Sequence, residues 1–315
     1  MNIDKKFVNY FISATERAAY GASLFRGKSD KIAADQAAVD EMRKELNKIN
    51  MKGRIVIGEG EMDEAPMLYI DEIVGNKNSN EEFDIAVDPL EGTNFAAKNL
   101  PNAISVLSVS QKGNLLNARD MYMEKIAIGS NLPEGLIDLD NDVAKNIKLL
   151  ADAKNTSPDQ LTACVLKRPR HDKIVESLNS LKVKIKFITD GDVSGVIAVT
   201  DPKLSVDIYL GIGGGPEGGL SASALACLNC QMQTRLFFQN DEEKNRVKKM
   251  GIKDLSRKYN IQDMVKGDVI FCATGITDGD MVKGICVKGD SFESETFVLH
   301  KSSKINKIVK RTTKK

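Results

Sequence analysis

The sequence predicts a layered α/β protein of two domains, with an α+β N-terminal half (residues 1–160) and an α/β C-terminal half (residues 161–315). A length of 315 residues favours two domains or one large α/β unit. Two helical patterns precede the first strands, and from about residue 163 strands alternate with helices. That alternation is typical of parallel strands joined by crossover helices.

Two helices are expected between about residues 4 and 50. Phe7 and Phe11 recur at the spacing of one helical face in the first helix. The second helix, over about 33–46, places Val39 and Met42 on one face and charged residues on the other. Both helices therefore have an apolar side that can pack on a sheet.

The rest of the chain reads as strands and shorter helices, and the basic tail at 301–315 is expected to be frayed and solvated. Expected strands lie at about 54–57, 83–88, 103–110, 114–128, 163–166, 183–188, 206–212, 268–272 and 295–299, and helical segments at about 67–70, 140–153, 157–160, 171–181, 192–199 and 219–229.

The composition excludes several classes of protein. A net charge of +1 gives no overall attraction to nucleic acid or to an anionic membrane. No apolar stretch reaches the roughly 18 residues that a membrane-spanning helix needs, and the N-terminus lacks a signal-peptide core. We therefore expect a cytoplasmic protein. Its five cysteines are expected to be reduced, including the CxxC pair Cys227 and Cys230.

One apolar strand, at 83–88, runs directly into a turn that is rich in oxygen ligands. Pro89 cannot continue a strand ladder, so the strand is expected to stop there, and Thr93 is a good N-cap for a following helix. The turn presents the carboxylates of Asp88 and Glu91 together with the Thr93 hydroxyl. Hard divalent cations prefer such ligands. The alternative is an acidic turn that is merely capped by Thr93.

The same arrangement occurs twice more. The strand at 55–57 runs into a glycine-spaced acidic turn that contains Glu59, Glu61 and Asp63. Further on, a strand ends in the glycine-rich segment 211–219, with Glu217 at the start of a helix. Three strand ends that carry carboxylates predict one shared metal site rather than three solvated loops.

These segments resemble a known family. Asp-Pro-Leu-Glu-Gly-Thr at 88–93 is similar to the signature of the lithium-sensitive, metal-dependent phosphatases, which have aspartate where this chain has Glu91. That departure, together with 57–69 and 211–218, resembles the class II (bacterial) fructose-1,6-bisphosphatases over nearly the whole chain. The resemblance implies the layered α/β/α/β/α sandwich of the sugar phosphatases.

The resemblance also implies an activity. The family hydrolyses the 1-phosphate of fructose 1,6-bisphosphate, a gluconeogenic reaction, to give fructose 6-phosphate and phosphate. Phosphate monoesters hydrolyse very slowly unaided, and two divalent ions about 4 Å apart can position the phosphate and stabilise its charge. We therefore expect two or more Mn²⁺ or Mg²⁺ ions per site, a small sugar bisphosphate as substrate, and a homo-oligomer (a dimer or tetramer).

The metal ligands are expected to be oxygen atoms from several segments. For Asp35 the alternative is an acid near a helix N-terminus, where the helix dipole favours negative charge. The expected ligands are Asp35, Glu59, Asp88, the Leu90 carbonyl, Glu91 and Glu217.

The expected catalytic residues are Thr93, Asp88, Glu61 and Asp63. The Thr93 hydroxyl would orient the attacking water. Glu61 and Asp63 would support the metal ligands or help to activate water, and the alternative for both is to solvate their loop.

The second phosphate of a bisphosphate requires cations of its own. Arg168 and Arg170 follow the strand at 163–166, and two arginines at a strand end suit phosphate recognition. In the family pattern the first of these is commonly lysine, which binds phosphate differently. The resemblance assigns further substrate contacts to Glu91, Gly92, Thr93, Tyr122, Asp190, Asp192 and Gly214.

A dinucleotide-binding dehydrogenase is the main alternative from another class. Gly213, Gly215 and Gly218 satisfy GxGxxG between a strand and a helix, and Asp241 lies about 20 residues further on. However, Glu217 would lie inside the turn that must cradle a pyrophosphate, and that placement is repulsive. A metal-ligand role explains Glu217 better.

Three closer alternatives remain open. They are an inositol monophosphatase-like enzyme, a dual fructose/sedoheptulose bisphosphatase, and a sugar-phosphate sensor without turnover. The arginine pair argues for a second anionic group on the ligand, and the full carboxylate set with Thr93 argues for turnover.

Overall fold

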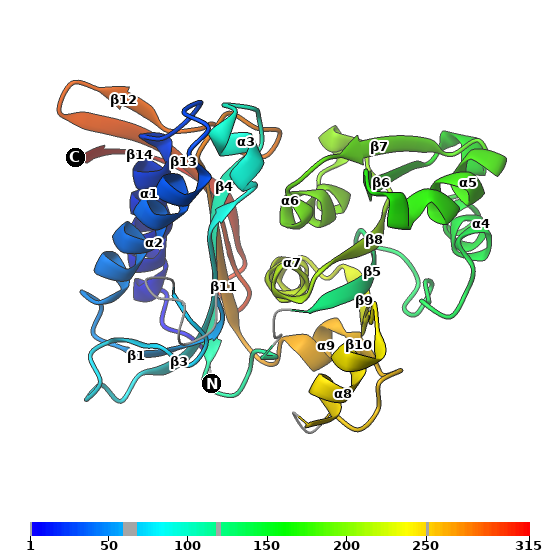
Figure 1. Ribbon diagram of the computed structural model, residues 1–315, viewed down its shortest axis with the longest axis horizontal. Coiled ribbons are helices and arrows are strands. Elements are labelled where there is room, and N and C mark those ends of the chain that lie inside the picture. The colour runs from blue at the N-terminus through cyan, green and yellow to red at the C-terminus, as the bar shows by residue number, and fades with distance from the viewer. Residues whose placement is uncertain (1, 59–67, 118–120, 250–251) are drawn as a thin grey trace. The chain divides into compact units, whose positions relative to one another are not determined.

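The computed structural model describes residues 2–58, 68–117, 121–249 and 252–315. The chain divides into two compact units, which are described separately. The first comprises Met1–Asn117 with Met264–Lys315, and the second comprises Ala118–Asp263. Figure 1 shows mixed helices and sheets in both, so the predicted layered α/β class is confirmed.

The first unit is built on an eight-stranded mixed sheet in the order β12–β13–β11–β4–β3–β1–β2, with β14 paired to β13. β1 and β3 are parallel, and the other described pairs in this sheet are antiparallel. The strands are β1 (Lys52–Ile57), β2 (Ile73–Gly75), β3 (Glu82–Glu91), β4 (Ile104–Gln111), β11 (Val269–Gly275), β12 (Cys286–Lys288), β13 (Ser291–His300) and β14 (Ile305–Lys314).

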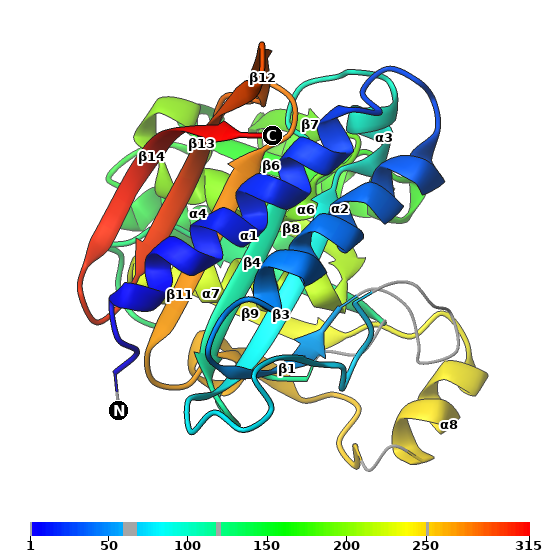
Figure 2. The same cartoon turned by 90° about the vertical axis from the view of Figure 1, so that its left-hand side faces the viewer.

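Two long helices, α1 (Lys6–Ser23) and α2 (Lys31–Leu46), lie side by side on one face of this sheet (Figure 2). The Asp30 side chain caps α2 by accepting a hydrogen bond from the Ala33 N–H at 3.0 Å. Phe7 and Phe11 are buried and pack against Phe83 of β3. Val39 and Met42 of α2 are buried as well, and α2 packs on β3. The predicted apolar faces of both helices are therefore confirmed.

The C-terminal tail differs from the prediction. Instead of a frayed end, residues 305–314 form β14, which pairs with β13 over its whole length. β-Branched residues such as Ile305, Val309 and Thr313 favour a strand. Arg311 fastens it to α1 by donating hydrogen bonds to Glu16 at 3.4 Å and to Asn9 at 2.8 Å. The expectation of a frayed tail was wrong because it was based on the lysines of this segment and not on its β-branched residues.

The second unit is built on a six-stranded mixed sheet in the order β10–β9–β5–β8–β6–β7. The predicted parallel layer is present as β7–β6–β8, and antiparallel strands extend it. The strands are β5 (Tyr122–Ile128), β6 (Thr162–Leu166), β7 (Lys184–Ile188), β8 (Ile208–Gly214), β9 (Gln231–Leu236) and β10 (Lys258–Asn260).

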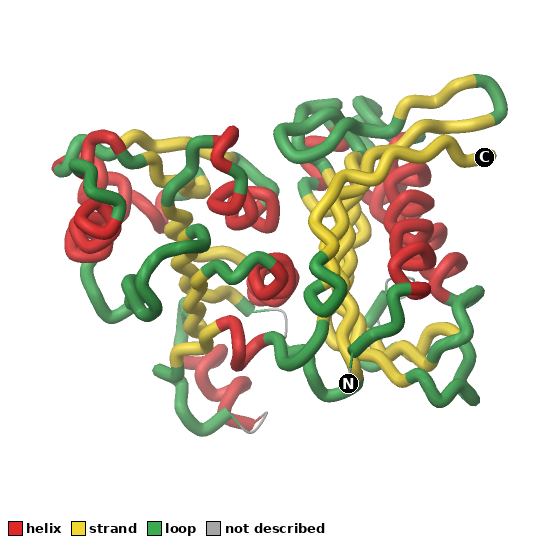
Figure 3. Tube along the Cα trace, turned by 180° about the vertical axis from the view of Figure 1, so that it is seen from behind, coloured by secondary structure: helices red, strands yellow, loops and turns green. Residues whose placement is uncertain are grey.

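Helices cover both faces of this second sheet, as Figures 1 and 3 show. α4 and α5 lie on one face, and α6 and α7 lie on the other. The remaining helical elements are short. The helices are α3 (Thr93–Ala97) in the first unit, and α4 (Val143–Ala153), α5 (Asp172–Ser180), α6 (Asp192–Ile197), α7 (Gly215–Cys227), α8 (Asp241–Lys249), α9 (Ile261–Met264), η1 (Pro158–Gln160), η2 (Pro169–His171), η3 (Ala198–Thr200) and η4 (Pro202–Leu204) further along the chain.

The division into units differs from the expected boundary at residue 160, which falls inside the second unit. The cause is that β11, β13 and β14 return to the first sheet, a long-range pairing that local sequence patterns do not reveal. The expected helical segment at 67–70 is also not seen, since residues 68–70 are not helical and Met67 lies outside the described residues. No helix among the described residues is both long and apolar enough to cross a membrane.

Candidate metal centre and substrate site

Two carboxylates of the first unit lie together at the end of β3. Asp88 and Glu91 are 8% and 6% exposed, and a carboxylate oxygen of one lies within 4.8 Å of a carboxylate oxygen of the other. The Leu90 N–H donates a hydrogen bond to Asp88 Oδ1 at 3.1 Å. Two acids this close and this buried repel each other unless a cation lies between them. The pair therefore suits a hard divalent ion.

The expectation that the strand stops at Pro89 was wrong. β3 extends through Pro89 to Glu91. The proline instead coincides with an irregularity in the pairing of β3 with β4, which shifts register between Asp88 and Glu91. This irregularity brings both carboxylates to the same turn, whereas strict alternation along a regular strand would send residues 88 and 91 to opposite faces.

The turn after β3 depends on Gly92. Its φ of 82° lies in the left-handed region, and it occupies the N-cap position of α3. Thr93 is thus the first residue of α3 rather than its N-cap, which corrects the sequence prediction. Its hydroxyl donates a hydrogen bond to the Leu90 carbonyl oxygen at 3.2 Å. The side chain is therefore held beside the acidic pair by its own turn.

Asp35 lies near the start of α2, which packs on both β3 and α3. Its Oδ1 atom is buried and has no hydrogen-bond partner within the described parts of the chain. Burial raises the pKa of this carboxyl to about 6. A buried carboxylate oxygen without a donor is unfavourable unless a cation compensates it, so a bound cation would fit Asp35 as well. Asp35 is not among the acidic residues whose carboxylate oxygens lie within 4.8 Å of one another, as those of Asp88 and Glu91 do.

Three predicted residues, Glu59, Glu61 and Asp63, lie outside the described residues. The strand before them, β1, pairs in parallel with β3, with Ile57 opposite Ala86.

In the second unit, Glu217 lies in the first turn of α7, after Pro216. The helix begins at Gly215, four residues earlier than expected, and β8 continues to Gly214. A Cβ atom on Gly214 would lie 2.0 Å from Glu217 Oε2, so the carboxylate packs directly against the Gly214 backbone. In this conformation of Glu217, a side chain at position 214 would clash with the carboxylate, which gives Gly214 a role that does not involve a pyrophosphate.

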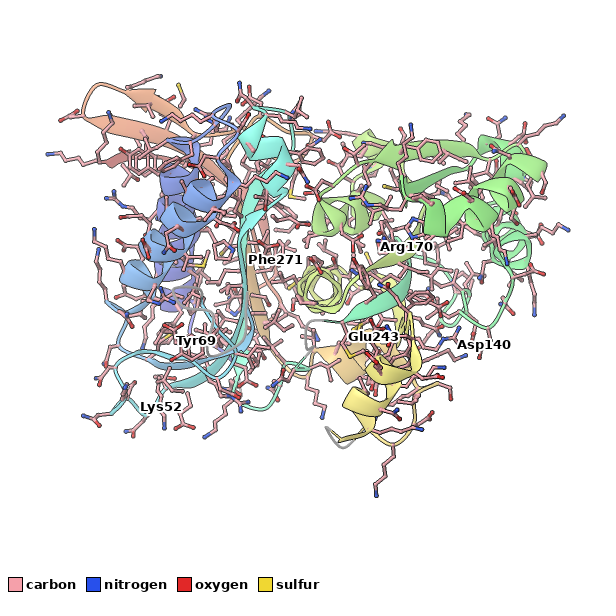
Figure 4. The ribbon with its side chains drawn as sticks, viewed as in Figure 1. Lys52, Tyr69, Asp140, Arg170, Glu243 and Phe271 are labelled. Carbon is pink, nitrogen blue, oxygen red and sulfur yellow. The ribbon has the colours of Figure 1, made fainter. Side chains whose placement is uncertain are left out.

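Tyr122, Arg170 and Gly214 also lie together in the second unit. Tyr122 pairs with Gly214 across β5 and β8. The Arg170 guanidinium lies 4.9 Å from the centre of the Tyr122 ring and donates two hydrogen bonds to the Ile212 carbonyl, at 3.0 and 2.8 Å. Figure 4 labels Arg170 in this unit. Stacking and hydrogen bonding hold its cationic side chain at the end of β8.

Arg168 and Asp190 lie shortly after the ends of β6 and β7. Arg168 precedes η2 and donates a hydrogen bond to the Lys167 carbonyl at 3.0 Å. Asp190 is half-buried just after β7. By contrast, Asp192 is 6% exposed, and its two carboxylate oxygens accept hydrogen bonds from Lys125 and from the Tyr209 hydroxyl.

Three buried residues close to these strand ends were not predicted from the sequence. Lys125 and Tyr209 are fully or nearly fully buried, and His171 is buried beside them. The Ile212 N–H donates to His171 Nε2 at 2.8 Å, and His171 Nδ1 lies 2.6 Å from the Leu166 carbonyl oxygen. Burial lowers the pKa of His171, so the neutral ring joins two strand ends. A lysine inside the apolar strand 122–128 was the available signal.

The comparisons with known protein sequences agree on one family. The model of bacterial, glpX-encoded fructose-1,6-bisphosphatase matches residues 5–313. The chain is 43% identical to a fructose-1,6-bisphosphatase class 2 of Haemophilus influenzae, over 95% of this chain and 93% of that protein. It is 38% identical to a D-fructose 1,6-bisphosphatase class 2/sedoheptulose 1,7-bisphosphatase of Synechococcus sp., over 98% and 95%.

Solved structures are less similar. An inositol monophosphatase (IMPase) of Thermotoga maritima gives a TM-score of 0.39 at 14% identity, covering 65% of this chain and 76% of that one. The family assignment therefore rests on the sequence comparisons.

Proposed function

Because this chain belongs to the family of bacterial, glpX-encoded fructose-1,6-bisphosphatases, we propose that it hydrolyses the 1-phosphate of fructose 1,6-bisphosphate by a metal-dependent mechanism. Hydrolysis of fructose bisphosphate is the function of this family. The observation that carries the proposal is the buried pair Asp88 and Glu91 at the end of β3.

The metal ligands in this proposal come from residues with oxygen donors. The proposed ligands are Asp35, Glu59, Asp88, the Leu90 carbonyl, Glu91 and Glu217. The buried Asp35 Oδ1 atom, which lacks a partner among the described residues, and the all-oxygen donor set both fit Mn²⁺ or Mg²⁺. Two or more such ions, when bound, would neutralise phosphoryl charge and lower the pKa of a water.

Thr93 is the residue we assign to the attacking water. Its hydroxyl proton is directed at the Leu90 carbonyl oxygen, so the oxygen lone pairs remain to accept a hydrogen bond from a water molecule. This water would donate one hydrogen to the Thr93 oxygen. An oxygen lone pair of the water would then be directed away from Thr93. Asp88 would act in the same step as a catalytic residue, and Glu61 and Asp63 would support it.

The substrate would extend over the second unit. Arg170 presents a cationic group next to Tyr122 and Gly214, and Arg168 follows the neighbouring strand β6. These residues would bind the phosphate that is not cleaved. Asp190, at the end of β7, would accept hydrogen bonds from sugar hydroxyls, and Glu91, Gly92 and Thr93 would contact the phosphate that is cleaved.

A dual activity is the second candidate function. The Synechococcus relative is named for both fructose 1,6- and sedoheptulose 1,7-bisphosphatase. The two substrates share both phosphate ends and differ by one carbon, so a site that recognises the ends would accept either.

One assay tests these proposals together. Phosphate release is measured from fructose 1,6-bisphosphate, sedoheptulose 1,7-bisphosphate, fructose 6-phosphate and inositol 1-phosphate, with Mg²⁺ or Mn²⁺ and with excess EDTA. We expect release from a bisphosphate that stops with EDTA. Full activity in EDTA, or preference for inositol 1-phosphate, would contradict the proposal. Titration with NAD by calorimetry provides the control for the dinucleotide alternative, and no heat of binding is expected.

A cytoplasmic location and a homo-oligomeric state also belong to the proposal. Cell fractionation tests the first, and light scattering on the purified protein tests the second.

A further inference from the structure

A buried ion pair lies beneath the glycine-rich turn of the second unit. Lys125 of β5 is 1% exposed, and its ammonium group donates a hydrogen bond to Asp192 Oδ2 at the start of α6. The hydroxyl of Tyr209, a fully buried residue of β8, donates to Asp192 Oδ1. Burying a charge is unfavourable unless it is both paired and hydrogen-bonded, and this trio meets that condition.

The trio is in direct contact with the turn that carries Glu217. A Cβ atom on Gly213 would lie 2.1 Å from Asp192 Oδ2, and one on Gly218 would lie 3.3 Å from Lys125 Cε. Asp192 and Lys125 therefore support the turn at its beginning and at its end. A side chain on Gly213 would displace the Asp192 carboxylate, whereas one on Gly218 would press only slightly on Lys125.

The contact continues from the turn to the Glu217 carboxylate. Gly214 follows Gly213 directly, and a Cβ atom on Gly214 would lie 2.0 Å from Glu217 Oε2. Asp192 therefore contacts Gly213, and the next residue, Gly214, contacts Glu217. In a close-packed interior, a displacement of Asp192 thus moves Glu217.

We propose that Lys125, Asp192 and Tyr209 are positioning residues, which hold the turn Gly213–Gly218 so that the Glu217 carboxylate is fixed as a metal ligand. The inference rests on the proposed function, because it takes Glu217 to bind the metal. It also gives Asp192 a different role from the contact with sugar hydroxyls that the family resemblance implies. Groups that orient a metal ligand typically change metal affinity or activity by about 10–100-fold when they are removed.

The test uses Lys125→Met, Asp192→Asn and Tyr209→Phe in the full-length protein. Mn²⁺ binding without substrate is measured by electron paramagnetic resonance, and kcat and KM for fructose 1,6-bisphosphate are measured at saturating Mn²⁺. We expect the Mn²⁺ dissociation constant to rise about tenfold or more in the first two variants and by a smaller factor in Tyr209→Phe, with KM nearly unchanged.

Two matched variants in the same unit serve as controls. Lys154→Met removes a lysine from a more exposed ion pair with Asp207, and Tyr259→Phe removes a phenol hydroxyl from the short strand β10 at the sheet edge. Both should bind Mn²⁺ as the wild type does. Near-ultraviolet circular dichroism checks that each variant is folded. If Lys125→Met does not fold, the inference is tested with Tyr209→Phe, which loses a single oxygen atom.

The outcomes separate the inference from the function on which it rests. Wild-type Mn²⁺ affinity in folded variants would overturn the inference, and a raised KM in the same variants would assign Asp192 to the sugar instead. Wild-type protein that binds no Mn²⁺ would overturn the proposed function itself.

Discussion

The hydroxyl of Thr93 donates a hydrogen bond to the carbonyl oxygen of Leu90, at 3.2 Å, across the turn that follows β3. The bond is possible because Gly92, between the two residues, adopts a positive φ of 82°. It fixes the side chain of Thr93 beside Asp88 and Glu91 and leaves its oxygen able to accept a hydrogen bond. The position of this oxygen is the geometric basis of the first prediction.

Thr93→Ala should reduce kcat by about 100-fold or more and leave KM within about threefold, because a positioned hydrogen-bonding group acts on the reacting water and not on substrate affinity. Thr93→Ser keeps the hydroxyl and should retain most of the turnover. Steady-state phosphate release at saturating Mn²⁺ measures both variants. A near-normal kcat in Thr93→Ala would remove the role we assign to this hydroxyl.

Asp88→Asn should abolish metal-dependent phosphate release, because the amide cannot supply the negative charge that a divalent ion requires. The matched control is Glu82→Gln at the other end of β3, where the carboxylate pairs with Lys52 and Lys112. This control should remain active. Activity titrated against Mn²⁺ measures both variants, and full activity in Asp88→Asn would refute the metal-dependent mechanism.

Arg170→Ala should raise KM for the bisphosphate by about 10–100-fold, since hydrogen bonds between charged groups contribute about 1.5–3 kcal/mol. Hydrolysis of a sugar monophosphate, which lacks the second phosphate, should change little. Comparing the two substrates distinguishes recognition of a phosphate from the support that Arg170 gives to Ile212 and Tyr122. Equal losses on both substrates would show that the residue is structural.

The pH dependence of stability should reflect Asp268, which is buried at the start of β11. Burial raises its pKa, but hydrogen bonds from His300, Ser302 and the Ile3 N–H outweigh that effect and hold the pKa of Asp268 below its usual range. The folded state thus binds this proton less tightly than the unfolded state, where the pKa is about 3.9. The stabilisation is complete above that value and is lost as the pH falls below it.

Asp268→Asn should therefore lower the free energy of unfolding by about 2 kcal/mol at neutral pH and flatten its decline in acid. Asp290→Asn, an exposed aspartate in the turn before β13, is the control and should behave as the wild type. Urea denaturation between neutral and acidic pH measures the difference. A variant whose stability falls with pH as steeply as the wild type would contradict the assignment to Asp268.

Much of the fold and of the site could be predicted from local patterns. The helical faces of Phe7 and Phe11 depend on residues close together in the sequence and were predicted correctly. The strand that carries Asp88 was also predicted, but it extends to Glu91 instead of ending before Pro89. The family assignment was likewise confirmed, because long motifs carry it. The pairing of β14 with β13 was not predicted, since the β-branched residues of this strand lie among lysines.

The contacts among Lys125, Asp192 and Tyr209 could not be predicted either, for a different reason. Lys125 and Asp192 are 67 residues apart, and their contact exists only once β5 and α6 have packed together. A lysine in an apolar strand indicates that some partner is needed, but the sequence does not say which one. The same holds for Tyr209, whose hydroxyl has a buried acceptor that only the tertiary structure supplies.

The return of the C-terminal strands to the first sheet has a consequence for synthesis on the ribosome. The edge of β4 is covered by β11, with Ile104 opposite Gly275, so this edge stays open until the nascent chain has grown past the whole second unit. The second unit is continuous in sequence and can fold as soon as it emerges. The first unit is thus completed last, and until then β4 has an unpaired edge at which another strand could add.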